Sequence, residues 1–128
     1  MRRLSTIFIL TFCIAIAGCA TKVPQETAPP LQPAEQPKQL RIGQGLDVVL
    51  STGYTTHIKP QTAWSLVGTI PQGEVYKSRD QVLTVEGEHV SEANLVLKGD
   101  ELVGFYLPVE HTFVRLSPTQ PLLIYPRE

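Results

Sequence analysis

The chain has 128 residues, which is enough for one small folded domain in addition to a targeting segment. Its formal net charge is -1, from 11 Lys and Arg against 12 Asp and Glu, and the basic residues are scattered along the sequence. A protein that holds nucleic acid needs a clustered basic surface that neutralises phosphates. We therefore expect no nucleic-acid partner.

The N-terminus has the layout of a secretory signal peptide. Arg2 and Arg3 form a basic region, and residues 4–17 form an apolar run. At about 14 residues, this run has the length of a secretory signal and is shorter than the roughly 20 residues that span a bilayer. The next residues complete the motif Ile16-Ala17-Gly18-Cys19. This motif resembles the lipobox of bacterial lipoprotein precursors, with isoleucine where that class most often has leucine.

The lipobox resemblance implies how the protein is processed and where it lies. It implies that the signal peptide, residues 1–18, is removed and that Cys19 is acylated, so that lipid chains anchor the protein in the bilayer. Ala20, which follows the cysteine, implies an outer-membrane location facing the periplasm, if the cell has two membranes. Cys13 is removed with the signal, which leaves no thiol for a disulfide, a metal or a nucleophile.

Residues 19–40 are rich in proline and glutamine and hold few large apolar side chains. Such a segment cannot bury enough surface to offset its chain entropy, so we predict a disordered linker. Proline extends it towards polyproline II at about 3.1 Å per residue, so some 20 residues reach on the order of 60 Å. The alternative is that the prolines are a ligand for a partner protein.

Residues 41–128 are expected to form one small all-β domain. Apolar residues recur with a period of two, as in 64–70, and no long window has the period of an amphipathic helix. Short turns separate the apolar runs, so neighbouring strands are expected to pair as an antiparallel meander that closes into a barrel or a sandwich. The predicted strands are 46–50, 64–70, 74–77, 81–86, 89–98, 101–107, 112–116 and 122–125.

The dipeptide Gly99-Asp100 predicts a two-residue hairpin turn. Regular pairing from this turn places Lys98 opposite Glu101, and further along it places Val96 opposite Val103 and Asn94 opposite Phe105. One face of the hairpin then carries Ala93, Leu95, Leu97, Leu102 and Tyr106, and the other carries Val96, Val103, Phe105 and Leu107. Because both faces are apolar, the hairpin is either covered on two sides or offers the second face as an interaction surface.

The three histidines are the residues best suited to a metal site or a catalytic site. They are His57, His89 and His111, and their spacing matches no metalloenzyme motif. If the Gly99-Asp100 hairpin extends far enough, His89 lies opposite Glu110 and Glu88 lies opposite His111, although Pro108 interrupts the hydrogen bonding. No Gly-x-Ser-x-Gly elbow and no pair of catalytic carboxylates is evident in the sequence.

Two classes of function remain open from the sequence. The first, which we favour, is a non-catalytic lipoprotein without a cofactor, whose β module binds or positions another component of the cell envelope, for example in a secretion or assembly machine. The second is a small envelope enzyme or metal-binding protein that uses His57, His89 and His111. The first depends on an apolar surface, whereas the second depends on the histidines.

Overall fold

The structure is a computed structural model that describes residues 25–87 and 89–127. All regular elements in these residues are strands, so the predicted all-β class is confirmed. The described part of the chain holds no helix with the length and apolarity needed to cross a membrane. The lipobox, Cys19 and Glu88 lie outside the described residues.

The described residues contain thirteen strands, which follow one another in sequence. They are β1 (Glu26–Thr27), β2 (Gln32–Pro33), β3 (Gln39–Ile42), β4 (Leu46–Val49), β5 (Thr55–Ile58), β6 (Thr62–Ile70), β7 (Gly73–Ser78), β8 (Thr84–Glu86), β9 (Val90–Glu92), β10 (Asn94–Lys98), β11 (Glu101–Leu107), β12 (Thr112–Pro121) and β13 (Ile124–Arg127).

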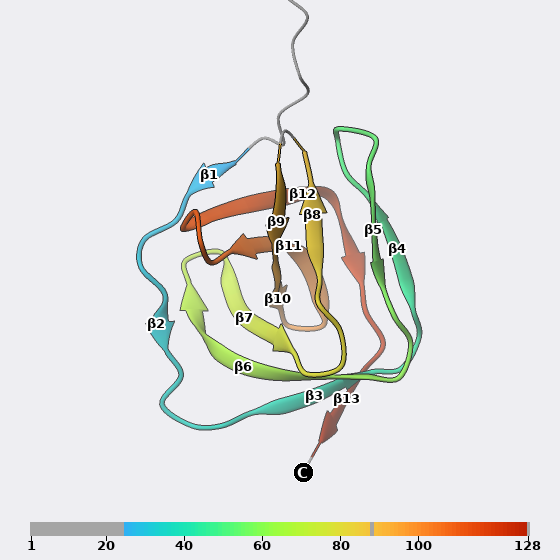
Figure 1. Cartoon of the computed structure of the whole chain (residues 1–128). Coiled ribbons are helices and arrows are strands. Elements are labelled where there is room, and N and C mark those ends of the chain that lie inside the picture. The colour runs from blue at the N-terminus through green and yellow to red at the C-terminus, as the bar shows by residue number, and fades with distance from the viewer. Residues whose placement is uncertain (1–24, 88, 128) are drawn as a thin grey trace, which may run out of the picture.

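Nine strands form one antiparallel sheet in the order β1-β12-β11-β10-β7-β6-β3-β13, with β2 also paired to β6. The expected meander is present where β6 pairs with β7 and where β10, β11 and β12 pair in sequence. Two hairpins, β4–β5 and β8–β9, interrupt it and form small sheets of their own. The hydrogen-bonded order stays open, and the strongly curled sheet with its hairpins makes a sandwich-like fold instead of a closed barrel (Figure 1).

The main hydrophobic core lies between the curled sheet and the two hairpins. Trp64, Leu95 and Phe105 of the sheet have no exposed surface, and they belong to one cluster with Val48 of β4 and Val85 of β8. The hairpins are joined to each other, because the Thr56 hydroxyl of β5 donates a hydrogen bond to the Thr84 carbonyl of β8 at 3.2 Å. Burial of an aromatic or aliphatic side chain contributes about 1.5–3 kcal/mol, so this cluster is the main source of stability.

A second apolar cluster lies on the opposite face of the sheet. It contains Val75, Val96 and Phe113, all without exposed surface, together with Ile70, Val103 and Tyr106. Residues 25–38, here called the strap, cross this face from β12 to β6 and bury Ala28 against it (Figure 1). The β10–β11 hairpin is therefore covered on two sides, as the first of the two sequence alternatives proposed.

The strap corrects the predicted boundary at residue 40. Within residues 25–40, β1 pairs with β12, β2 and β3 pair with β6, and Ala28 and Leu40 are buried, whereas the sequence predicted a disordered linker there. Gly68 makes the close approach possible, because a Cβ atom at this position would collide with the backbone carbonyl of Gln32. The few apolar residues of the strap are buried by strands that are distant in the sequence. The composition of the strap itself does not reveal these contacts, so it predicted disorder.

The predicted hairpin register is correct at the tip and wrong beyond it. Lys98 lies opposite Glu101 and Leu97 opposite Leu102, but Val96 then lies opposite Gly104 because Val103 is an extra residue in β11. A bulge of this kind shifts every later residue to the other face of its strand. Phe105 therefore points into the main core instead of sharing a face with Val103.

Several strand boundaries differ from the prediction for one physical reason. The predicted strand 89–98 is divided at Ala93 into β9 and β10, because the amide of Ala93 donates a hydrogen bond to Leu83 and β9 pairs with β8. The predicted strand 81–86 shortens to β8 for the same reason. β5 was not predicted as a strand, and neither were β1 and β2 in the predicted linker and β3 across its end.

Candidate functional site

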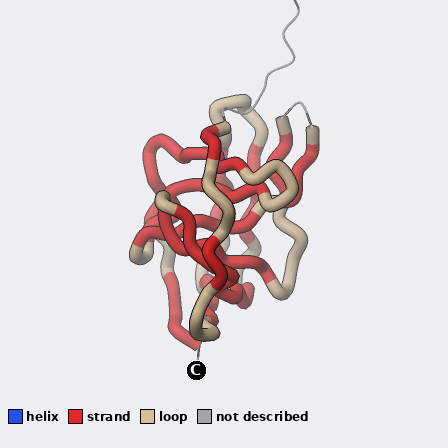
Figure 2. The backbone as a smooth tube through the Cα atoms, turned by 90° about the vertical axis from the view of Figure 1, so that its left-hand side faces the viewer, coloured by secondary structure: helices blue, strands red, loops and turns tan. Residues whose placement is uncertain are grey.

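The candidate site lies at the end of the molecule where β3 and β13 meet. β13 is the last strand of the sheet order, and of the described strands only β3 pairs with it. In both views this end is opposite the end where the described chain begins at Gln25 (Figures 1 and 2). An edge strand presents unpaired backbone donors and acceptors, which makes it a template for another strand. Pro126 has no N–H, so the donors that β13 can offer come from its other residues.

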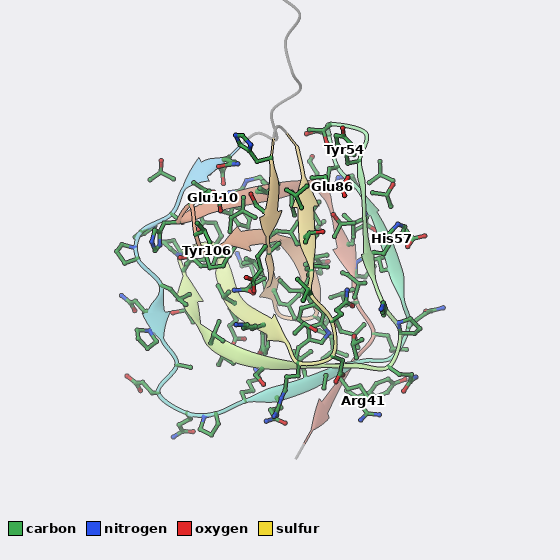
Figure 3. The ribbon with its side chains drawn as sticks, viewed as in Figure 1. Arg41, Tyr54, His57, Glu86, Tyr106 and Glu110 are labelled. Carbon is green, nitrogen blue, oxygen red and sulfur yellow. The ribbon has the colours of Figure 1, made fainter. Side chains whose placement is uncertain are left out.

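Apolar side chains flank the β13 edge on its outer side. Leu123 is 51% exposed and Tyr125 is 49% exposed. The Tyr125 ring lies against Gly43, where a Cβ atom would come within 2.5 Å of the ring. Arg41 lies opposite Tyr125 in the β3–β13 pairing and extends from this end of the molecule (Figure 3). Two exposed apolar side chains and one cation thus lie beside an unpaired edge.

A groove of 410 Å³ opens on the inner side of the same edge. Leu40, Tyr76 and Ile124 are its apolar lining residues, and Lys38 and Asp100 are charged residues of its wall. Leu40 and Tyr76 are buried members of the main core, so the groove opens directly onto that core. A largely apolar depression with a few polar groups is the usual form of a binding site.

Three side chains from the strap and β7 form a polar group at this groove. The Lys38 ammonium lies 3.4 Å from a carboxylate oxygen of Glu74, and the Tyr76 hydroxyl donates a 3.5 Å hydrogen bond to the other oxygen. Burial raises the pKa of Tyr76 above its ordinary value. The Tyr76 hydroxyl, and secondarily the Glu74 carboxylate, raise the pKa of Lys38. At neutral pH the groove therefore has a cation and a neutral phenol at its wall.

A second depression of 520 Å³ adjoins the groove. It runs along residues 32–38 of the strap and is bounded by Leu66 and Thr69 of β6. Pro37 and Lys38 line both depressions, so the two depressions lie on either side of the strap's end.

The interaction face predicted from the sequence is not a single exposed face. Val96, Val103, Phe105 and Leu107 are all buried, with 0%, 7%, 0% and 1% exposure. Val96 and Val103 lie in the cluster under the strap, whereas Phe105 and Leu107 lie in the main core. The bulge at Val103 separates the two pairs. The strap covers the pair Val96 and Val103, for which the sequence had allowed an exposed interaction surface.

The structure does not bring the three histidines together. His57 Nδ1 lies 2.6 Å from Asp47 Oδ1 on the β4–β5 hairpin. His111 Nδ1 lies 3.2 Å from the hydroxyl of Tyr106. His57 and Tyr106 are on opposite sides of the molecule, at the right and the left of Figure 3. His89 lies in the turn between β8 and β9. Among residues 25–87 and 89–127, no group of three or more His, Cys, Asp or Glu side chains is arranged to hold a metal ion.

The predicted pairing of His89 with Glu110 is also wrong. The β10–β11 ladder ends at the pair Asn94 and Tyr106, and Glu110 instead accepts a 2.8 Å hydrogen bond from the Ser91 hydroxyl. The change of partner from β11 to β8 at Ala93 removes His89 from the ladder that the prediction extended.

The groove was not predictable from the sequence. Lys38, Tyr76, Asp100 and Ile124 come from four distant parts of the chain, and Lys38 belonged to the predicted linker. The one local signal was the exposed alternation Leu123-Ile124-Tyr125 near the C-terminal end. Comparisons with protein-family models, with curated proteins and with solved structures found no match to this chain.

Proposed function

We propose that the chain is a non-catalytic, lipid-anchored protein of the cell envelope whose β domain captures an extended segment of another envelope protein. The anchor is the acylated Cys19, in the outer membrane and facing the periplasm. The capture site is the β13 edge together with the groove beside Tyr76.

The observation that carries this proposal is the unpaired edge of β13 next to an apolar groove. A segment that adds to this edge gains backbone hydrogen bonds from β13, which give affinity without regard to sequence. Its side chains alternate between two sides, so one set reaches the groove beside Ile124 and the other set lies along Leu123 and Tyr125. The groove then selects an apolar side chain, and Arg41 favours an acidic neighbour.

The anchor is tested by metabolic labelling with a fatty acid. We expect the native protein to retain label and the Cys19→Ala protein to lose it. Label on the Cys19→Ala protein would overturn the lipobox assignment and with it the anchored location.

The capture site is tested by a photo-crosslinking amino acid placed at Tyr125 in the native cell. We expect a discrete adduct with an envelope protein, and we expect Leu123→Lys to reduce its amount. The matched control carries the same crosslinker at Val82, which is 79% exposed on the loop before β8. The same adduct from both positions, or none from position 125, would reject β13 as the capture site.

A further inference from the structure

The anchored end of the domain carries a group of exposed apolar side chains. Val49 and Tyr54 of the β4–β5 hairpin are 68% and 46% exposed, and Val90 at the start of β9 is 67% exposed. Val109, in the turn between β11 and β12, is 76% exposed. The two hairpin tips project at the same end in both views, and Tyr54 is at this end (Figures 1–3).

The first described residues lie at this same end. The Thr112 hydroxyl donates a 3.0 Å hydrogen bond to the side chain of Gln25, and the amide of Ala28 donates one to the carbonyl of His111. The turn that carries Val109 is thus beside the point where the chain leaves towards Cys19. The Ser91–Glu110 hydrogen bond joins that turn to β9, which carries Val90.

The length of the connection limits how far this end can lie from the anchor. Gln25 is six residues after Cys19. Even fully extended, that length of chain spans only about 20 Å. A domain of about 100 residues has a radius of gyration of roughly 13 Å and is about 35 Å across, so the connection is shorter than the domain. The domain therefore cannot stand on the bilayer by its β13 end while the strap is in place, because Gln25 would then lie further from the bilayer than the connection can reach.

We propose that Tyr54, Val90 and Val109 contact the phospholipid bilayer and hold the domain upright on it, with β13 directed away from the membrane. The inference rests on the lipid anchor of the proposed function and adds the contact surface. A tyrosine side chain is suited to the headgroup region, and valine side chains to the acyl boundary behind it. Glu86 and Glu110 are exposed near these loops, so the surface fits a bilayer of mainly zwitterionic lipid.

The contact is tested by tryptophan quenching in vesicles of phosphatidylcholine brominated near the headgroup. Two variants of the mature protein, Val90→Trp and Val82→Trp, are reconstituted in these vesicles. Both replace an exposed valine on a loop by tryptophan, so they differ only in position. Trp64 has no exposed surface and gives the same background in both. We expect bromine to remove most of the emission added by Val90→Trp and none of that added by Val82→Trp. Equal quenching of the two, or none, would overturn the contact.

Two further arms separate the contact from the anchor. In the first, the chain from Cys19 is coupled through its thiol to a maleimide lipid, so that the quenching result does not depend on acylation in the cell. In the second, Tyr54→Ser with Val109→Ser is added to the Val90→Trp protein, and we expect quenching to fall. Unchanged quenching would mean that the short connection alone sets the orientation, and the proposed lipid contact would be rejected.

Discussion

Tyr76 is a residue whose ionisation reports on the candidate groove. Its side chain is 1% exposed, and burial raises its pKa. We therefore expect the phenolate absorbance of the domain to contain a late component, above the ordinary tyrosine range, that belongs to Tyr76. Tyr76→Phe removes that late component, and Tyr54→Phe is the control that leaves it in place. A late component that survives Tyr76→Phe would contradict the assignment.

The same shifts give a dependence of stability on pH. The pKa values of Tyr76 and Lys38 are both raised in the folded state, so their contribution is complete below the unfolded values and is lost as pH rises through the folded values. Stability is expected to be constant from neutral pH to about pH 9 and to fall above about pH 10. The fall is expected to be smaller in Tyr76→Phe, measured as the change of melting temperature with pH. A larger fall in Tyr76→Phe would contradict the sign of the shift.

Val103 and Phe105 lie on opposite faces of β11, and both faces are buried. We expect Val103→Asp and Phe105→Asp each to unfold the isolated domain, because burial of an unpaired carboxylate costs several kcal/mol against a total of about 5–15 kcal/mol. Val109→Asp, on an exposed turn, is the control and should melt like the native domain. A folded Val103→Asp domain would show that the strap leaves this face open.

Two features of the β10–β11 hairpin differ in whether the sequence could predict them. The turn Gly99-Asp100 was predictable, because Gly99 adopts the positive φ of 64° that this hairpin turn needs and the tip pairs follow from it. The bulge at Val103 was not predictable, since valine there has ordinary strand propensity. It is Gly104, packed under Phe113 and the β12 backbone, that marks the irregular position, and those contacts are not local.

At the scale of elements, the strap is the segment that a single substitution can detach from the sheet. A side chain at Gly68 would strike the strap backbone at Gln32 and the side chain of Leu31. We expect Gly68→Val to detach β2 from β6 and to cost about 2 kcal/mol, the order of one lost apolar side-chain burial. Protease cleavage within residues 30–36 should become faster while the domain stays folded. Thr69→Val, one residue along the same strand, is the control. Equal cleavage of the two variants would contradict the close contact between Gly68 and the strap.

Elements paired with sequence neighbours were largely predictable, and those paired with distant segments were not. The period of two and the turn residues predicted β6, β7, β11 and β12. β2 and β3 pair with β6, which comes later in the chain after the β4–β5 hairpin, and no local pattern in the Pro/Gln-rich segment indicates that pairing. The groove at Tyr76 depends on the same long-range packing, so the sequence could not predict it.

At the scale of the whole molecule, the strap sets the boundary of the stable domain. A chain that begins at residue 39 keeps β3 but loses the cover over Val75, Val96 and Phe113. We expect it to fold with a β-type circular dichroism spectrum, to melt lower than a chain that begins at residue 25, and to bind a dye that reports exposed apolar surface. Equal melting temperatures would show that the strap contributes nothing to stability.

The attachment of the strap has a mechanical consequence. Its ladder contacts with the domain are two short ones, β1 with β12 and β2 with β6, supported by the exposed Arg115–Glu26 ion pair at 3.0 Å. In the anchored, partner-bound protein that we propose, a pull between the lipid and the partner would enter at residue 25. We expect it to break these contacts first, while the strands of the core remain paired. Released in this way, residues 25–38 would reach roughly 45 Å when extended, of which the gain is the part beyond the span that the strap already covers. In the proposed protein the strap is thus a stored length: under load we expect the capture site to travel away from the bilayer without unfolding of the core, and to be drawn back when the load ends.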